Sequence, residues 1–85
     1  MNNFFITGMI INFEDKSEKL TVIGISTKDG IIDVSAIGKT AELIRTYFVK
    51  GDFITVSGKI KKIKKEDKYY YNFVVNEFGF CKTKK

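Results

Sequence analysis

The sequence predicts an all-β fold with one short helix, and two observations support this fold class. Five segments rich in β-branched and aromatic residues are separated by short polar turns. Between the third and the fourth of these segments, apolar residues instead recur at three- and four-residue spacing, which is typical of an amphipathic helix. The 85 residues contain no proline, and their glycines occur singly, so we expect one domain without a linker.

The first three expected strands lie in the N-terminal half. Residues 4–13 (FFITGMIINF) are apolar and β-branched and end at the polar stretch EDKSEK, which predicts a strand followed by a turn. The β pattern returns in Leu20 to Ser26 and again in Ile31 to Ile37. The TKDG sequence between these two segments contains Asp-Gly, a strong hairpin signal, so we expect them to pair through a tight turn.

The helix is expected over Lys39 to Val49. We expect Thr40 to cap its start and Gly51 to end it. Its apolar positions are those that recur at helical spacing: Ala41, Leu43, Ile44, Tyr47 and Phe48.

The last two strands are expected over residues 53–63 and 69–76, joined by a turn at EDK. In the fourth strand Ile54, Val56, Gly58 and Ile60 share one face. Ile63 breaks this alternation between flanking lysines, which predicts either a bulge there or a strand that leaves the body of the fold as a projecting arm.

Three strands, one helix and two strands match a five-stranded Greek-key barrel of the OB-fold type, with the helix between strands 3 and 4. A two-layer α+β sheet fits the same order. We expect the OB-fold domain to span residues 1–78, followed by a short basic C-terminal tail over residues 79–85.

The net charge of +5 lies entirely in the C-terminal part of the chain. Residues 1–50 carry six basic and six acidic side chains, whereas residues 51–85 carry nine basic and four acidic ones. Most of the excess is in GKIKKIKKEDK (58–68), directly before three tyrosines. Lysines attract phosphates without reading sequence, and rings stack on unpaired bases, so this pattern predicts single-stranded nucleic acid as the ligand. Lysines that only keep a hairpin soluble and protect its edges are the simpler alternative.

The candidate nucleic-acid residues fall into three groups. Tyr69 and Tyr71 share the parity of core-like Phe73 and Val75, so they could instead be barrel wall, whereas Tyr70 has the opposite parity. Phe53 and Thr55 lie on a mixed polar, basic and aromatic face of the fourth strand. The candidate phosphate contacts are Lys59, Lys61, Lys62, Lys64, Lys65 and Lys68.

Catalytic and metal chemistry have no support in the sequence. It contains no histidine, and its one cysteine, Cys81, stands in a basic stretch without a base to activate it. We therefore expect no enzyme, no catalytic residues, no metal and no cofactor. No run approaches the roughly 18 apolar residues of a membrane span, and no signal peptide is evident, so a soluble cytoplasmic protein is expected.

The stretch from Ile31 to Lys62 resembles the middle of the bacterial single-stranded DNA-binding proteins (the SSB family). That family's third strand ends in Gly-Lys, here Gly38-Lys39, followed by a short helix, a Lys-Gly (Lys50-Gly51) and a strand that ends in Gly58 before a basic hairpin. The opening NNFFITGMI also fits the family's first strand. The resemblance covers about residues 2–78.

The resemblance implies an OB-fold that binds single-stranded DNA without sequence preference in replication, recombination or transfer, with Lys39 at a basic position of the family. It also implies a homodimer or homotetramer through the first strand (Phe4 to Ile11). The chain has no tryptophan, and three of the family's aromatic positions fall near Ile31, on Ile37 and near Lys65. This departure implies weaker binding.

The end of the sequence, CKTKK, has no likeness to the family's acidic tail, and in this respect the chain is similar to the family's primosomal relatives. The bias to Lys, Ile and Asn indicates an AT-rich genome, and a phage or plasmid origin fits the small size and the lack of an acidic tail. Two alternatives stay open: a protein-interaction adaptor of a replisome or mobile element on the same fold, and RNA binding.

Overall fold

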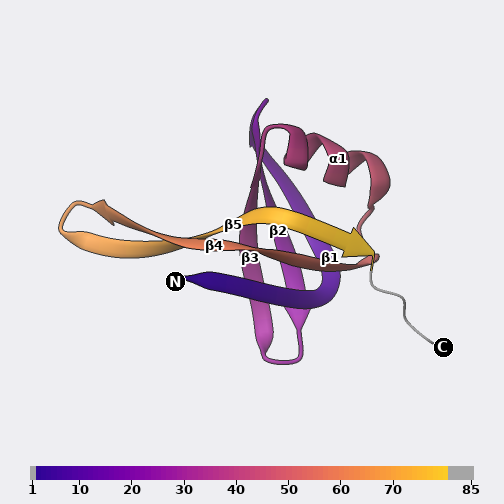
Figure 1. Cartoon of the computed structure of the whole chain (residues 1–85), viewed down its shortest axis with the longest axis horizontal. Helices are drawn as coiled ribbons and strands as arrows, with labels where there is room; N and C mark the ends of the chain where they lie inside the picture. Colours follow the sequence, from indigo (N-terminus) through magenta and orange to yellow (C-terminus); the bar gives the residue numbers. More distant parts are fainter. Residues whose placement is uncertain (1, 81–85) are drawn as a thin grey trace.

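A computed structural model describes residues 2–80, most of which form β-strands. The elements are β1 (Asn3–Ser17), β2 (Leu20–Thr27), β3 (Gly30–Ile37), α1 (Lys39–Tyr47), β4 (Phe53–Lys65) and β5 (Lys68–Phe80). The strands close into one barrel in the order β1-β2-β3-β5-β4 (Figure 1). The predicted five-stranded OB-fold barrel with a helix between strands 3 and 4 is confirmed, and the two-layer sheet is wrong.

Alternating residues of the strands fill the barrel. Ile23 and Ile25 of β2 and Ile54 and Val56 of β4 are fully buried, as the alternation in the sequence predicts. Phe4 of β1 meets Phe73 of β5 edge to face at 5.2 Å between ring centroids. Burial of these apolar side chains is the main stabilising contribution to the barrel.

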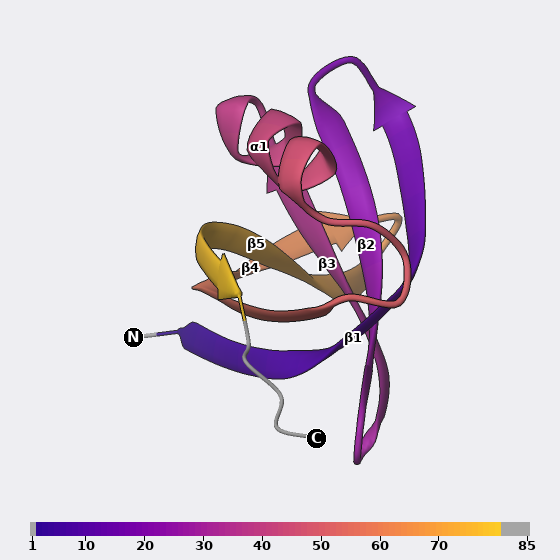
Figure 2. The same ribbon diagram turned by 90° about the vertical axis from the view of Figure 1, so that its right-hand side faces the viewer.

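Helix α1 closes one side of the barrel with its apolar face (Figure 2). Ala41 and Ile44 of α1 are buried, and so is Phe48 directly after it. The Phe48 ring stacks on Phe80 at 4.5 Å and meets Phe78 edge to face at 5.9 Å. The end of β5 is therefore held against the helix. No helix within residues 2–80 is long and apolar enough to cross a membrane.

The structure confirms the predicted start of the helix at Lys39 but corrects its capping residue and its end. The N-cap is Gly38, at φ 63°, and its carbonyl accepts a hydrogen bond from the Glu42 N–H at 3.1 Å. Thr40 is instead inside the first turn, because the backbone enters α1 through a left-handed conformation that glycine adopts without strain. The helix ends at Tyr47, and Gly51 lies in the turn that follows.

Two strands are each five residues longer than the sequence predicts, whereas the other three differ by one or two residues. β1 continues through Glu14 to Ser17, because these polar residues pair with β2 and the turn shrinks to Glu18 and Lys19. β5 continues to Phe80, because its last residues pair with the start of β4. The rest of the expected basic tail, including Cys81, lies outside the described residues.

The barrel closes through a narrow seam between β3 and β5. One parallel pair, Ser35 with Val74, joins these strands, and the Ser35 hydroxyl donates a hydrogen bond to Asn72 Oδ1 at 2.8 Å. Close by, the pairing of β4 with β5 shifts between Ser57 and Gly58. The strands approach so closely at this shift that a Cβ on Gly58 would lie 1.8 Å from the Val74 carbonyl oxygen.

Beyond the seam, β4 and β5 continue as a two-stranded hairpin that projects from the barrel (Figure 1). We call residues 61–71 the arm. The predicted projection at Ile63 is confirmed, and a bulge at Ile63 is wrong, because the pairing runs in step from Gly58 with Val75 to Lys65 with Lys68.

Candidate nucleic-acid interface

The register of β4 with β5 sorts the side chains of the arm onto two opposite faces. Directly opposed residues of an antiparallel pair point to the same side, and successive residues point to opposite sides. The two faces are therefore composed of different pairs. The Tyr69/Tyr71 face carries Lys62 with Tyr71 and Lys64 with Tyr69, and the Tyr70 face carries Lys61 with Asn72, Ile63 with Tyr70 and Lys65 with Lys68.

On the Tyr69/Tyr71 face, lysine ammonium groups lie over an aromatic ring. Lys62 Nζ is 4.4 Å from the centroid of the Tyr69 ring, and Lys64 Nζ is 5.9 Å from it. This cation–π geometry holds the charges beside the ring. The rings of Tyr69 and Tyr71 are 54% and 63% exposed. The sequence left barrel wall as an alternative for both rings, and the structure places them on the surface.

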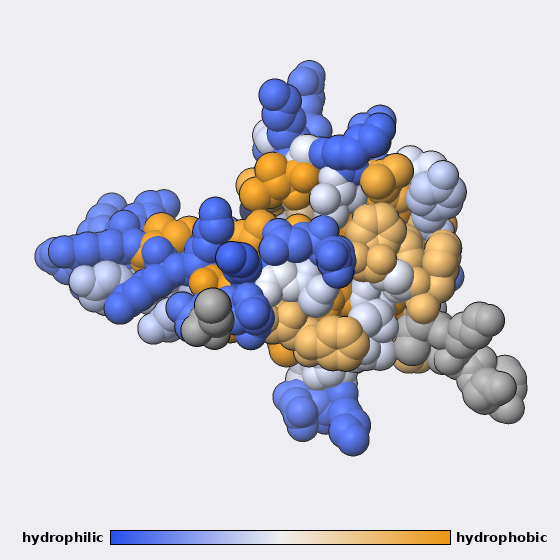
Figure 3. Space-filling model, viewed as in Figure 1, coloured by the Kyte–Doolittle hydropathy of each residue, from blue (hydrophilic) through white to orange (hydrophobic). Residues whose placement is uncertain are grey.

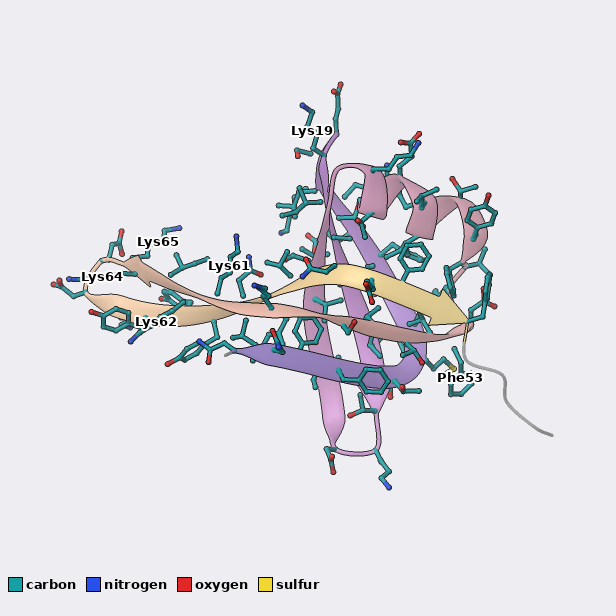
Figure 4. The ribbon with its side chains drawn as sticks, viewed as in Figure 1. Lys19, Phe53, Lys61, Lys62, Lys64 and Lys65 are labelled. Atoms are coloured by element: carbon teal, nitrogen blue, oxygen red, sulfur yellow. The ribbon has the colours of Figure 1, made fainter. Side chains whose placement is uncertain are left out.

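On the Tyr70 face, an aromatic ring and an aliphatic side chain lie side by side. Tyr70 is 52% exposed and opposes Ile63, which is 43% exposed. Together with Lys65 and Glu66 they line an open hollow. In Figure 4, Lys61 and Lys65 project to the side of the arm that faces away from Lys62.

The positive charge of the arm is not neutralised by ion pairs within the described residues. The ion pairs of residues 2–80 join Lys16 with Glu14, Lys39 with Glu42 and Arg45 with Asp15. All of them lie off the arm, whose acidic residues, Glu66 and Asp67, occupy the turn at its tip. The hydrophilic surface that results is visible in Figure 3.

The structure brings most of the candidate residues together on the arm or at its base. Lys59 precedes the arm and pairs with Val74, and the other lysines and the three tyrosines lie along the hairpin. Together these are Lys59, Lys61, Lys62, Lys64, Lys65, Lys68, Tyr69, Tyr70 and Tyr71.

Three candidates lie elsewhere. Lys39 begins α1 and lines a hollow with Glu18 and Lys19 of the β1–β2 turn. Phe53 lies at the opposite end of the molecule from Lys64 and Lys65 (Figure 4). Thr55 is on the barrel wall, with its hydroxyl 3.1 Å from that of Thr7. A ligand that contacts all three and the arm would have to cross the barrel.

The exposed apolar side chains that were not among the candidate residues include three on β1 and β3. Ile31 and Ile37 of β3 are exposed, at positions where the family resemblance expects rings. Phe5 of β1 is also exposed. The family resemblance could have identified Ile31 and Ile37 as candidate residues. Nothing in the apolar run of residues 4–13 shows that Phe5 points outward whereas Phe4 is buried.

The barrel and its hairpin define an OB-fold protein with a projecting arm that is both cationic and aromatic. Among solved structures, the chain is similar to the mitochondrial single-stranded DNA-binding protein Rim1 of S. cerevisiae, with a TM-score of 0.78, 14% identity and coverage of 99% of this chain and 98% of that one. It is also similar to the second single-stranded DNA-binding protein (SSBb) of Mycobacterium smegmatis, with a TM-score of 0.77, 17% identity and coverage of 99% and 94%. At these identities the likeness concerns the fold. Neither a protein-family model nor a curated protein sequence matches the chain.

Proposed function

We propose that this chain binds single-stranded DNA with little sequence preference. The observation that carries the proposal is the arm, where five lysines and three tyrosines are exposed on one projecting hairpin. Phosphates would contact the lysines and unpaired bases would stack on the rings. The solved proteins of the same fold named above bind single-stranded DNA, which supports the same ligand here.

The tyrosines favour single strands over duplex. A base already stacked and paired in a duplex offers no free face to a ring, whereas an unpaired base does. Each stacked ring contributes about 1 to 3 kcal/mol, so this chain should bind more weakly than a relative with a full set of tryptophans.

The proposal is tested by fluorescence anisotropy of a labelled dT oligomer of about 30 nucleotides, titrated at several salt concentrations beside a duplex and an RNA of equal length. If five lysines contact phosphates, the logarithm of the binding constant should fall with the logarithm of salt concentration at a slope of about 3.5. The variant K61A/K62A/K64A/K65A should lose this binding.

The matched control is K16A/K19A/K28A/K50A, which removes the same charge from exposed lysines off the arm. Equal losses in both variants would mean that only net charge matters. If wild type does not bind DNA at low salt, the proposal is refuted. If it binds RNA more tightly than DNA, the ligand is RNA.

We also propose that the chain forms a homodimer or homotetramer through β1. Within the described residues, β1 pairs with β4 from Asn3 to Met9 but with β2 only from Met9 onward. The segment before Met9 therefore has one open edge, and Phe5 is exposed beside it. A second copy could add its own β1 to this edge. Light scattering should show that wild type is an oligomer and that the Phe5→Glu variant is a monomer. A monomeric wild type would contradict oligomerisation through β1.

For the biological setting, we propose replication, recombination or transfer of DNA in the cytoplasm. The protein-interaction alternative is favoured by a different part of the molecule. Phe13, Phe48 and Val49 line an apolar hollow together with Arg45 and Lys50, away from the arm. If wild type fails to bind nucleic acid, this hollow is the surface to pursue.

A further inference from the structure

The arm presents two open faces, not one. Every residue from Lys61 to Tyr71 is exposed, and within residues 2–80 only β4 and β5 pair along this stretch. A hairpin that merely extended the barrel wall would keep one face on the core. Here both faces are available to a ligand.

Each face carries both kinds of group that a single strand needs. The Tyr69/Tyr71 face combines Lys62 and Lys64 with two rings, and the Tyr70 face combines Lys61 and Lys65 with one ring and Ile63. Cations bind phosphates and rings stack bases. Lysines that served solubility alone would not need rings beside them on both sides.

A single run of nucleotides along one face cannot reach the lysines of the other. Lys61 and Lys65 project to one side of the ribbon and Lys62 to the opposite side (Figure 4). From Lys61 to Lys65 the strand advances about 13 Å, at roughly 3.3 Å per residue. This length suits a few nucleotides on each face, within the range of about 4 to 16 nucleotides that an OB-fold covers.

We propose that the arm holds two segments of single-stranded DNA at once, one on each face, and so brings two strands, or two stretches of one strand, to opposite sides of the same hairpin. This inference rests on the proposed single-strand binding. The inference adds a strand-bridging activity to the proposed single-strand binding.

The test counts short oligomers per chain by native mass spectrometry, using dT of about eight nucleotides at low salt. Counting per chain makes the result independent of the oligomeric state. Wild type should bind two oligomers per chain. K61A/K65A and K62A/K64A should each bind one, on the face left intact. The control K16A/K28A removes the same charge off the arm and should bind two. Circular dichroism confirms that each variant folds.

One oligomer per wild-type chain would overturn the two-face inference while leaving single-strand binding intact. The same follows if one pair variant loses all binding and the other loses none. No binding by wild type would instead refute the proposed function itself. A dT of about 40 nucleotides distinguishes two separate strands from two stretches of one strand. One oligomer per chain, with both faces needed for full affinity, indicates two stretches of one strand. Two oligomers per chain indicate separate strands.

Discussion

The arm is built from β4 and β5, which are also two of the five strands of the barrel, yet the alternating side chains of these strands are buried in one region and exposed in the other. In β4, Ile54 is fully buried, whereas Lys62, at an alternate position of the same strand, is exposed, and Ile63 beside it is 43% exposed. In the barrel, the inward side chains of β4 pack in the core shared with the other strands, and beyond Ile60 only β5, within the described residues, pairs with β4. Hydrophobic alternation therefore identifies a strand, whereas contacts with the neighbouring elements determine which of its residues become core.

The largest difference in stability is expected when an isoleucine of the barrel and an isoleucine of the arm are each replaced by alanine. Ile54→Ala should destabilise the fold by about 2 to 5 kcal/mol, because it opens a cavity in a packed core. Ile63→Ala should change the free energy of unfolding by less than about 0.5 kcal/mol, because the side chain lies on the surface. Chemical denaturation of both variants measures the difference. Equal losses would mean that the arm is part of the cooperative core.

The junction between the two regions should be nearly as sensitive. Gly58→Ala should cost about 1 to 3 kcal/mol, because its Cβ would collide with the Val74 carbonyl. Gly79→Ala is the matched control in β5, where an added Cβ meets no atom of the described residues within 4 Å. Thermal unfolding should therefore separate the two alanine variants. A Gly58→Ala protein as stable as wild type would show that the strands can separate there.

A smaller effect is expected at the seam. Ser35→Ala removes the hydrogen bond to Asn72 and should lower the free energy of unfolding by about 0.5 to 1.5 kcal/mol. Asn72→Ala should cost a similar amount, and the double variant little more than either single one. Denaturation of the four proteins in a double-mutant cycle measures this coupling, and fully additive losses would contradict it.

An effect of similar size, but stabilising, is expected at the tip of the arm. Glu66 and Asp67 have φ of 52° and 67°, the left-handed conformation that a two-residue hairpin turn needs and that favours glycine at its second position. Asp67→Gly should stabilise the closed arm by about 1 kcal/mol, so arm amides should exchange with solvent about fivefold more slowly. Barrel amides serve as the internal control. Faster exchange in the arm would contradict the prediction.

Much of the fold could be predicted because its local signals agree with its packing. The Asp-Gly turn and the helical spacing of Ala41, Ile44 and Phe48 each had one consistent interpretation, and the structure confirms both elements. The C-terminal ends of β1 and β5 could not be predicted. In β1, for example, the polar residues Glu14 and Asp15 belong to the strand only because they pair with residues of β2.

The arm was partly predictable as well. The break at Ile63 indicated the projection, and the lysine run indicated its charge. The sequence could not show which lysines share a face with which tyrosines, because that pairing depends on the register of β4 with β5. Nor could it separate Lys39 and Phe53 from the arm, since distance in space follows from how the barrel closes.

The unbroken register of the arm has a consequence for how its length can vary. Since side chains alternate with a period of two, adding or removing two residues on each strand would lengthen or shorten the hairpin and keep every remaining side chain on its own face. An insertion of one residue in β4 would instead exchange the faces of the lysines beyond it. The length of the arm can therefore change by two residues on each strand at a time, while the barrel stays the same.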